Sequence, residues 1–450
     1  MKTCIRGGTI VTCDGAHRVM HGDVLIDGAR IVSVGPSPSP HAGISAPAGG
    51  EALQVIDATG CVVMPGLVQA HVHLVQTLFR GLADDVPLLA WLRRFIWPLE
   101  AAHDEASLRL SAELGAAELL LGGTTTILDM GTVHGHDAVF EAVGRSGLRA
   151  ISGKAMMDVG EGVPKGLRET TRASLRESER LARDWSGAAD GRLGYAYCPR
   201  FILSCSEALL RECAAVAAAH GALVHTHAAE HEEERKAVKD LLGADDVALL
   251  ARFGITGERA VLAHGVQLTD EEMRQLAAAK TRIVHCPSSN LKLGSGIARV
   301  HAMREAGVVV ALGADGAPCN NNLDGWVEMR LAALLAKVRS GTTTLPARDV
   351  IRMATIDGAR ALSLHDQVGS LEVGKRADIV VLDVNGVQAA PAVDVMSTLV
   401  YAAQSRDVRH VLVDGRVVVR HGELVTLDAA RIARLACEEA PKVARRAGVT

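Results

Sequence analysis

Short apolar runs that end in a histidine or an aspartate are the feature that most constrains the fold of this chain. The run at 61–68 leads into His71-Val72-His73, and alternation along a strand would send both imidazoles to the same side. Similar runs end in polar side chains further along the chain, at His225 and His227, His264, His285 and Asp315. A (β/α)8 barrel keeps its active site at the carboxyl ends of its strands, so the pattern favours that fold.

The middle of the chain alternates strand-like and helix-like segments, which indicates a parallel β/α architecture. Helical spans such as 105–121 and 206–220 carry Ala and Leu at i, i+3 and i+4 and should form an outer ring. Strands are expected at about 66–72, 124–130, 148–153, 193–198, 222–227, 260–264, 282–286 and 308–314. These are eight strands, the number that closes the barrel.

The two ends of the chain read as short strands joined by turns. Residues 23–34 hold an Asp-Gly pair typical of a hairpin, and 377–383 and 408–419 repeat the pattern near the other end. Neither half is large enough to bury a sandwich core alone. We therefore expect one small β-sandwich domain built from 1–64 and 368–425 together.

The rest of the chain divides accordingly. We expect an α/β fold in which 65–367 form the barrel and 426–450 form a C-terminal surface helix. Asp428 is a suitable N-cap for that helix. Pro441 is expected to break it, because proline lacks the N–H that a helix interior uses.

Composition narrows the class of ligand. A net charge of -4 without a sustained basic run gives no electrostatic footprint for nucleic acid, so we expect a small-molecule ligand. The start lacks the apolar core of a signal peptide, and no apolar run is long enough to span a membrane, so a cytoplasmic protein is expected. The nine cysteines form no CxxC pair and predict neither a disulfide framework nor a thiolate zinc site. The sequence leaves open whether the protein is a homo-oligomer.

Four stretches carry a resemblance to a known family. They are Pro65 to His73, Cys286 to Leu293, Leu312 to Gly316 and Gly374 to Val380. In this order they resemble the amidohydrolase superfamily, specifically its hydrolytic deaminases of amino-substituted heteroaromatic rings. The resemblance runs from about residue 5 to about residue 425. It implies a (β/α)8 barrel enzyme that holds one divalent ion per subunit, with Zn²⁺ favoured and Fe²⁺ or another divalent metal as the alternative.

The resemblance also implies which residues hold the metal. His71, His73, His227 and Asp315 match the family's ligands, and Asp315 would also contact the nucleophilic water. From the residues alone, Asp315 before a glycine could instead be a helix N-cap. His225 competes with His227, and the resemblance decides for His227 because the family's ligand precedes its catalytic glutamate by three residues. His225 is then expected to support or pack against the site.

The chemistry needs a proton donor beside the metal. Attack on an aromatic C–NH2 carbon stalls unless the neighbouring ring nitrogen is protonated, and a carboxylic acid meets that need. Glu230 is the candidate, whereas Glu232 to Glu234 are expected to form a solvated helix face. His264 matches the family's histidine that orients the metal-bound water; otherwise it would be a hydrogen-bonded core histidine.

Two sets of residues favour different substrates. Relatives that deaminate S-adenosylhomocysteine, methylthioadenosine or 5'-deoxyadenosine have a Trp matching Trp91, which packs on the ligand, and a Glu matching Glu100, which binds ribose hydroxyls. Glu100 could equally be an ordinary residue in the first turn of a helix. Arg200, in Pro-Arg-Phe, resembles guanine deaminases instead, where the Arg donates to an oxygenated purine. Cys319 replaces a Ser usual in the adenosine branch, which puts a hydroxyl contact there in doubt.

The sequence therefore predicts a metal-dependent deaminase of an aminopurine, with a 5'-modified adenosine favoured as substrate. The alternatives are a guanine or oxidised-guanine deaminase and a triazine hydrolase. A more remote alternative is a binding member of the fold without catalytic activity. A missing metal ligand would point to that case, but every expected ligand is present.

Overall fold

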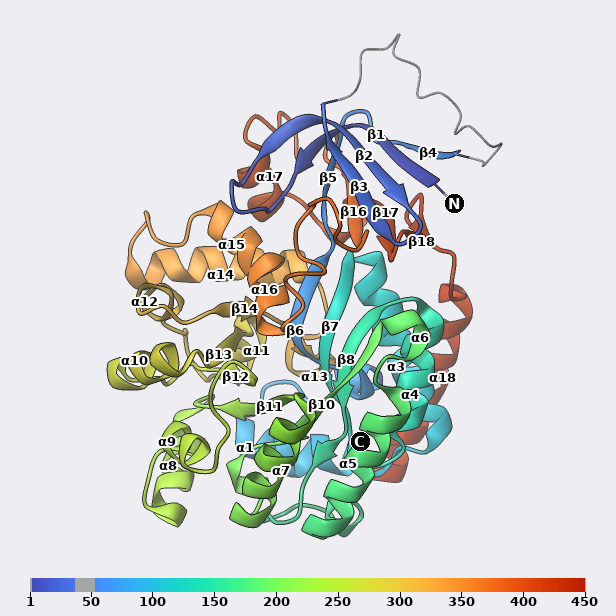
Figure 1. Cartoon of the computed structure of the whole chain (residues 1–450). Coiled ribbons are helices and arrows are strands. Elements are labelled where there is room, and N and C mark those ends of the chain that lie inside the picture. Colours follow the sequence, from blue (N-terminus) through green and yellow to red (C-terminus); the bar gives the residue numbers. More distant parts are fainter. Residues whose placement is uncertain (1, 37–52, 450) are drawn as a thin grey trace.

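A parallel barrel and a smaller β unit make up the computed structural model, which describes residues 2–36 and 53–449 (Figure 1). The strands of the barrel pair in the order β14-β13-β12-β11-β10-β8-β7-β6-β15, and β9 (Ala155–Met156) pairs with β10. Their bounds are β6 (Leu67–His73), β7 (Thr124–Met130), β8 (Arg149–Gly153), β10 (Leu193–Pro199), β11 (Leu223–Ala228), β12 (Ala260–His264), β13 (Arg282–His285), β14 (Val310–Leu312) and β15 (Asp315–Gly316). The eight expected strands and the barrel are confirmed, with β14 and β15 as two halves of the last strand.

The split eighth strand closes the ring. Its first half, β14, pairs with β13, and its second half, β15, pairs in parallel with β6, where Asp315 lies opposite Val72. Gly313 lies between the halves, and a side-chain carbon there would be 2.6 Å from the backbone oxygen of His71. The close approach of the first and last strands therefore needs a glycine at this position.

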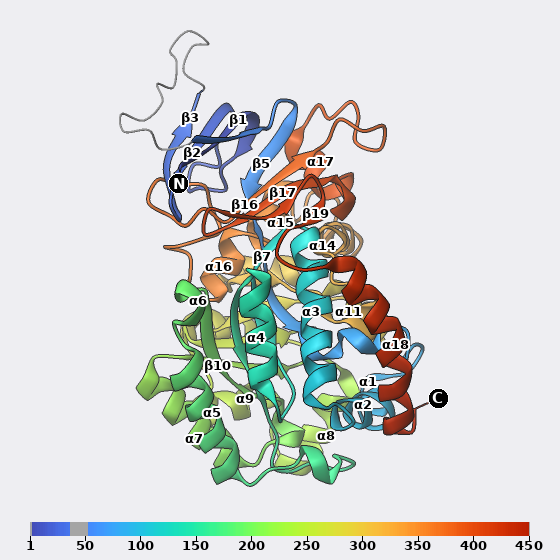
Figure 2. The ribbon, with the colours of Figure 1, turned by 90° about the vertical axis from the view of Figure 1, so that its right-hand side faces the viewer.

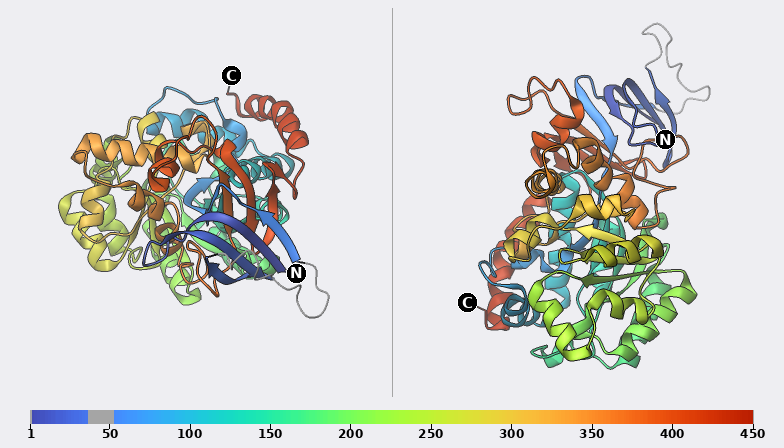
Figure 3. Two further views of the ribbon diagram at one scale, coloured as in Figure 1. Left: turned by 90° about the horizontal axis from the view of Figure 1, so that it is seen from above. Right: turned by 90° about the vertical axis from the view of Figure 1, so that its left-hand side faces the viewer.

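Helices cover the outside of the barrel (Figure 3). The expected spans are confirmed, because α3 begins after Asp104 with a capping box and α7 begins after Ser206, whose side chain accepts a backbone N–H. The outer helices are α3 (Glu105–Leu121), α4 (His136–Ser146), α5 (Thr171–Trp185), α7 (Glu207–His220), α8 (Glu232–Leu242), α9 (Asp246–Arg252), α10 (Asp270–Ala279), α12 (Val300–Glu305) and α14 (Gly325–Ser340).

Short helices fill the connections. Several follow the carboxyl ends of barrel strands and so lie where the site residues are expected. They are η1 (Leu74–Phe79), α1 (Leu88–Trp91), the π-helical turn η2 (Leu92–Ile96), α2 (Trp97–Ala101), η3 (Lys165–Leu167), η4 (Ile202–Ser204), α11 (Pro287–Lys292) and α13 (Ala317–Asn320). The others are α6 (Ala188–Gly191), α15 (Ala347–Met353), α16 (Ile356–Ala361), α17 (Val395–Tyr401) and η5 (Ser405–Asp407).

Both chain ends build the smaller β unit, as expected. Its strands pair in the order β19-β18-β17-β16-β5-β1-β2-β3, with β4 beside β1, and their inner side chains form an apolar core that includes Ile10, Ile26 and Val381. Their bounds are β1 (Lys2–Val11), β2 (Val19–Asp27), β3 (Arg30–Gly35), β4 (Leu53–Asp57), β5 (Cys61–Pro65), β16 (Ile379–Asp383), β17 (Val408–Val413), β18 (Arg416–Arg420) and β19 (Glu423–Leu424). We keep 1–64 with 368–425, 65–367 and 426–450 as proposed domain limits.

The C-terminal helix α18 (Ala429–Ala447) lies along α3 (Figure 2). Asp428 caps it as expected, since its side chain accepts the backbone N–H of Arg431 at 2.9 Å. The expected break at Pro441 is wrong, because the helix continues through the proline. Val443 and Ala444 beyond it are buried in an apolar cluster with residues of η1 and α2, and this packing holds the last turns in place. Among the described residues, no helix is both long enough and apolar enough to cross a membrane.

A buried ion-pair network joins the barrel to the β unit. Arg149, at the start of β8, lies 2.8 Å from an oxygen of Asp378 and 2.5 Å from one of Asp414. All three side chains are at most 6% exposed. Asp414 also donates its backbone N–H to Asp378 at 2.8 Å. One barrel residue thus holds two carboxylates of the other unit in place.

Arg149→Met is expected to lower the free energy of unfolding by about 3–5 kcal/mol, because it leaves two buried carboxylates without their cation. Urea unfolding at neutral pH measures this loss. Arg145→Met is the matched control, since Arg145 is half exposed and pairs with Glu113 on the surface. That change should cost no more than about 1 kcal/mol. Equal losses in the two variants would contradict the role of the network.

Candidate metal centre and active site

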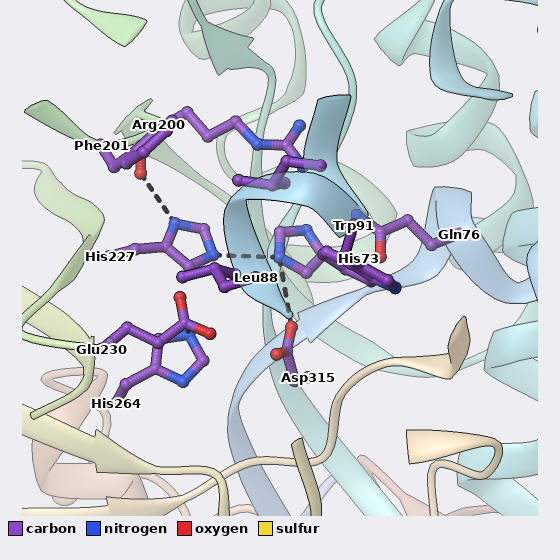
Figure 4. A pocket seen from close by; sticks show the side chains of 11 residues that line it. His73, Gln76, Leu88, Trp91, Arg200, Phe201, His227, Glu230, His264 and Asp315 are labelled. Atoms are coloured by element: carbon purple, nitrogen blue, oxygen red, sulfur yellow. Dashed lines mark hydrogen bonds and ion pairs between the residues drawn. The ribbon is translucent and has the colours of Figure 1, made fainter. Parts of the chain in front are cut away.

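Four side chains from three barrel strands meet at one point. His71 and His73 come from β6, His227 from β11 and Asp315 from β15, and one ligand atom of each lies within 4.8 Å of all the others. Three of the four are buried and His227 is partly buried. Figure 4 shows His73, His227 and Asp315 turned towards a common centre. The structure thus brings together the group that the sequence predicts.

Hydrogen bonds fix which nitrogen of His73 and His227 faces this centre. Nδ1 of His73 lies 2.7 Å from the carbonyl oxygen of Met130, and Nδ1 of His227 lies 2.7 Å from that of Arg200. A carbonyl oxygen only accepts, so each Nδ1 carries the proton. In the neutral rings each Nε2 atom then carries a lone pair and no proton. The two Nε2 atoms lie 3.3 Å apart. Two lone pairs at this distance repel unless a cation lies between them.

His71 is oriented in the same way through His225. Nδ1 of His225 donates to the carbonyl oxygen of Val261 at 3.0 Å, so its Nε2 accepts from Nδ1 of His71 at 2.7 Å. The neutral His71 ring therefore presents a bare Nε2, which lies 3.2 Å from Oδ1 of Asp315 and has no hydrogen-bond partner among the described residues. A divalent cation satisfies this donor set. His225 acts as the support of His71.

The protonation states suit a metal. Burial lowers the pKa of His73 to about 3 and that of His227 well below its usual range, so both rings are neutral at pH 7. Burial alone would raise the pKa of Asp315, but His71, His73 and His264 hold it well below the usual range. Neutral imidazole and ionised carboxylate are the forms that bind metals.

Two side chains of helix α11 hold residues of the site by hydrogen bonds. Ser289 donates its hydroxyl to Oδ2 of Asp315 at 2.6 Å, and Nδ1 of His264 lies 3.0 Å from Oδ1 of Asn290. Asp315 and His264 both have left-handed backbones, with φ of 63° and 77°. Such strain in non-glycine residues persists where the surroundings impose it. No role was predicted for Ser289 and Asn290, although both belong to the stretch from Cys286 to Leu293 that resembles the family.

Glu230 lies in the loop after β11 and faces His264. Its Oε2 is 3.4 Å from Nε2 of His264, and the residue is 4% exposed. Burial, followed by the charges of Glu234 and Asp315, raises its pKa well above the usual range. Glu230 is therefore disposed to hold a proton near neutral pH, as a general acid requires.

One sequence expectation about this loop is wrong. Glu232 and Glu233 are exposed as expected, but Glu234 is only 2% exposed. Its carboxylate accepts the backbone N–H of Glu230 at 3.3 Å, and burial raises its pKa to about 8. In the first turn of α8, the side chain of Glu234 therefore points inwards and contacts the loop that carries Glu230.

A small cavity lies over the metal-binding group (Figure 4). Its volume is about 20 Å³, which is enough for about one water molecule. Leu88, Trp91 and Leu92 cover it from α1 and η2. π-Helical turns such as η2 are frequent at functional sites.

Residues 62–418 of the chain match the sequence model of the amidohydrolase family. The chain belongs to the amidohydrolase family. It is 41% identical to a 5-methylthioadenosine/S-adenosylhomocysteine deaminase of Halobacterium salinarum, over 99% of this chain and 98% of the relative. It is 41% identical to a 5'-deoxyadenosine deaminase of Methanothermobacter thermautotrophicus, over 96% of each chain. The structure of an adenosine deaminase from Xanthomonas campestris with bound zinc is similar, with a TM-score of 0.91, 31% identity and 98% of each chain covered.

Of the four residues expected to contact the substrate in this amidohydrolase, two line the cavity and two do not. Trp91 and Arg200 line the cavity, together with Phe201. Glu100 and Cys319 do not belong to the lining. The sulfur of Cys319 is fully buried and lies 3.0 Å from the carbonyl oxygen of Gly316. Contact of Glu100 or Cys319 with a substrate stays an untested prediction.

His225→Leu is expected to weaken metal binding by about 10- to 100-fold, because His71 loses the acceptor that fixes its ring. Competition with a chelator, followed by metal analysis, measures the affinity. His301→Leu is the control, since His301 lies on α12 beside the exposed carboxylate of Glu305. Unchanged affinity in the His225 variant would show that His71 is held by other contacts.

Proposed function

We propose that this amidohydrolase is a metal-dependent hydrolytic deaminase of an aminopurine, with a 5'-modified adenosine as the favoured substrate. The observation that carries the proposal is a buried carboxylic acid, Glu230, that faces the same cavity as the metal-binding group. The names of two relatives at 41% identity support the substrate class. S-Adenosylhomocysteine, methylthioadenosine and 5'-deoxyadenosine are the candidates.

The metal would be held by three bare imidazole nitrogens and one carboxylate oxygen. His71, His73, His227 and Asp315 provide this N/O donor set, which suits zinc and also accommodates Fe²⁺. A bound divalent ion would lower the pKa of a water molecule and so supply a nucleophile at neutral pH. Asp315 places its Oδ1 towards His71 and His73, where it can accept a proton from that water.

Glu230 moves the proton. As a neutral acid it donates to the ring nitrogen beside the amine-bearing carbon, which makes that carbon electrophilic. Of the two protons of the attacking water, one would pass through Asp315 and Glu230 to the departing amine, and the other would return to Glu230 as the carbonyl group of the product forms. His264 donates from Nδ1 to Asn290, so its Nε2 faces Glu230 as an acceptor and can hold the carboxyl group or the water in place.

The remaining lining residues fit a flat heteroaromatic ring. Trp91 and Phe201 provide aromatic surface, and Leu88 and Leu92 add apolar side chains that would help a bound ring to exclude water. Exclusion of water strengthens the electrostatic effect of Glu230 and Asp315 on the ring.

A second candidate is an oxygenated base such as guanine or 8-oxoguanine. Arg200 favours it, because its guanidinium lines the cavity and can only donate hydrogen bonds. A carbonyl oxygen or a bare ring nitrogen is the matching partner. A substituted triazine offers bare ring nitrogens too and belongs in the same test.

Purified protein with its metal content measured is expected to release ammonia from at least one of the 5'-modified adenosines. The panel should contain methylthioadenosine, S-adenosylhomocysteine, 5'-deoxyadenosine, guanine, 8-oxoguanine and melamine. Chelation should abolish the release and added Zn²⁺ should restore it, because the water needs the ion to become a nucleophile. Turnover of guanine with all adenosines inert would favour the second candidate. No release from any compound would reject the deaminase proposal.

Glu230→Gln is expected to lower kcat by about 10²-fold or more while metal content and melting temperature stay unchanged, because an amide cannot transfer the proton. Steady-state ammonia release measures the effect. Glu233→Gln is the control, since Glu233 is an exposed glutamate in the first turn of α8. Near wild-type turnover in the Glu230 variant would exclude Glu230 as the proton shuttle.

A further inference from the structure

The turn after β11 carries Glu230 and is held by buried carboxylates of the next two helices. Ala229, the first residue of this turn, donates its backbone N–H to Oδ2 of Asp246 at 2.5 Å. Glu230 donates its own backbone N–H to Oε2 of Glu234 at 3.3 Å. Asp246 begins α9 and Glu234 lies in the first turn of α8, and both residues are at most 2% exposed. Two consecutive N–H groups thus each have a carboxylate as partner.

The backbone of Ala229 depends on such contacts. Its φ of 51° lies in the left-handed region, where a side-chain carbon is strained. Its carbonyl oxygen accepts the backbone N–H of Gln267 at 2.8 Å, so both of its polar backbone groups are bound from outside β11. A residue of this kind persists where its surroundings impose the conformation. The change from strand to left-handed backbone redirects the chain, and it therefore sets the direction of the Glu230 side chain that follows.

The loop after β12 is bound to the same turn. Gly265 donates its backbone N–H to the carbonyl oxygen of Ala228 at 3.1 Å, in addition to the bond that Ala229 accepts from this loop. The loop begins beside His264, whose Nε2 lies 3.4 Å from Oε2 of Glu230. The turn and the loop therefore form one hydrogen-bonded unit in which the two side chains face each other.

Asp246 does more than begin a helix. Its Oδ1 accepts the N–H of Val247 at 2.9 Å within α9, whereas its Oδ2 reaches Ala229 on another element. Because both oxygens accept from N–H groups, neither carries a proton. A buried carboxylate is costly without a partner. Arg235 lies 3.7 Å from Oδ1 and is bound in turn by Glu272 at 2.7 Å, which offsets part of that cost.

We propose that Asp246 and Glu234 are positioning residues that hold the turn at 229–230, so that the carboxyl group of Glu230 faces His264 and the cavity. Neither residue belongs to the cavity lining, so both act through Glu230. The proposal rests on the proposed deaminase function and deepens it, because it names the groups that set the proton donor in place.

Asp246→Asn and Glu234→Leu test the two contacts. An asparagine offers one oxygen to two N–H donors, and a leucine offers none. Glu234→Gln is the conservative variant, because its amide oxygen can still accept the N–H of Glu230. Asp407→Asn is the matched control, since Asp407 is also buried and accepts a backbone N–H, from Gln404, outside the cavity lining.

Each change is made both in the native protein and in Glu230→Gln protein. The rate of ammonia release is measured in single turnovers with metal-loaded protein in excess, on the compound that the unmodified enzyme deaminates fastest and at the pH optimum of each variant. Single turnovers also detect the slow reaction of the Glu230→Gln background. KM, metal content and melting temperature are recorded beside the rate.

Asp246→Asn and Glu234→Leu should each lower the rate by about 10- to 100-fold with KM and metal content unchanged, because a displacement of about 1 Å can cost 10²-fold. Glu234→Gln should restore most of the rate that Glu234→Leu loses, and Asp407→Asn should keep the full rate. In the Glu230→Gln background the same changes should lower the rate by no more than about twofold, because no acid is left to position.

Amide hydrogen exchange gives a readout that needs no reaction. The backbone amides of 229–231, followed by mass spectrometry, should exchange at least about tenfold faster in Asp246→Asn and Glu234→Leu than in the native protein. The Asp407 variant should leave this exchange unchanged. Faster exchange in the turn together with a slower reaction supports the proposal.

Four results would overturn the proposal. They are a loss of rate that persists in the Glu230→Gln background, a loss of metal that accompanies the loss of rate, unfolding of both variants, and exchange at 229–231 that neither variant changes. The second result would assign the turn to the ligand His227, and the third would assign both carboxylates to the fold. Absence of ammonia release by the unmodified enzyme rejects the deaminase proposal alone, because amide exchange still tests the hold on the turn.

Discussion

The site depends on the close approach of three unprotonated imidazole nitrogens, from His71, His73 and His227, to the carboxylate of Asp315. Backbone carbonyls and His225 hold the outer nitrogens of the rings, so the inner lone pairs face one another and Asp315 without protons between them. Burial keeps the pKa of His73 near 3, which prevents the ring from relieving the repulsion by taking a proton. A cation is the group that turns this repulsion into binding, and part of the folding free energy of the site is therefore linked to metal binding.

The barrel makes this meeting possible through its last strand. The strand is split at Gly313, pairs with its predecessor by one half and with the first strand by the other, and so delivers Asp315 beside His71 and His73. The left-handed backbones of Asp315 and His264 are held by α11 through Ser289 and Asn290. Strain at the strand ends is thus offset by hydrogen bonds from a neighbouring helix, which keeps Asp315 and His264 in one geometry.

Glu100 and Arg200, which favour different substrates in the sequence, are partners in the structure. Glu100 suggests a nucleoside and Arg200 an oxygenated base when each is considered alone. In the structure they form one buried ion pair, and Glu100 also binds the amide of Gln76. Removing one member would leave the other as an unpaired buried charge, so neither position can change independently. The two side chains and the Gln76 amide therefore form one connected polar group beside the cavity.

The sequence by itself determined the barrel strands and the composite β unit, because these depend on periodicity and residue type. Position at strand ends indicated the histidines and the aspartate, and the family resemblance singled out the four metal-binding residues among them. The same resemblance indicated Glu230, three residues after His227. Tertiary structure decided the rest. Glu234 turns inwards and α18 continues through Pro441 because packing outweighs local preference. The contacts of Ser289, Asn290, Gln76 and Glu100 join residues far apart in the chain, and no local pattern records which way a side chain faces once two loops meet.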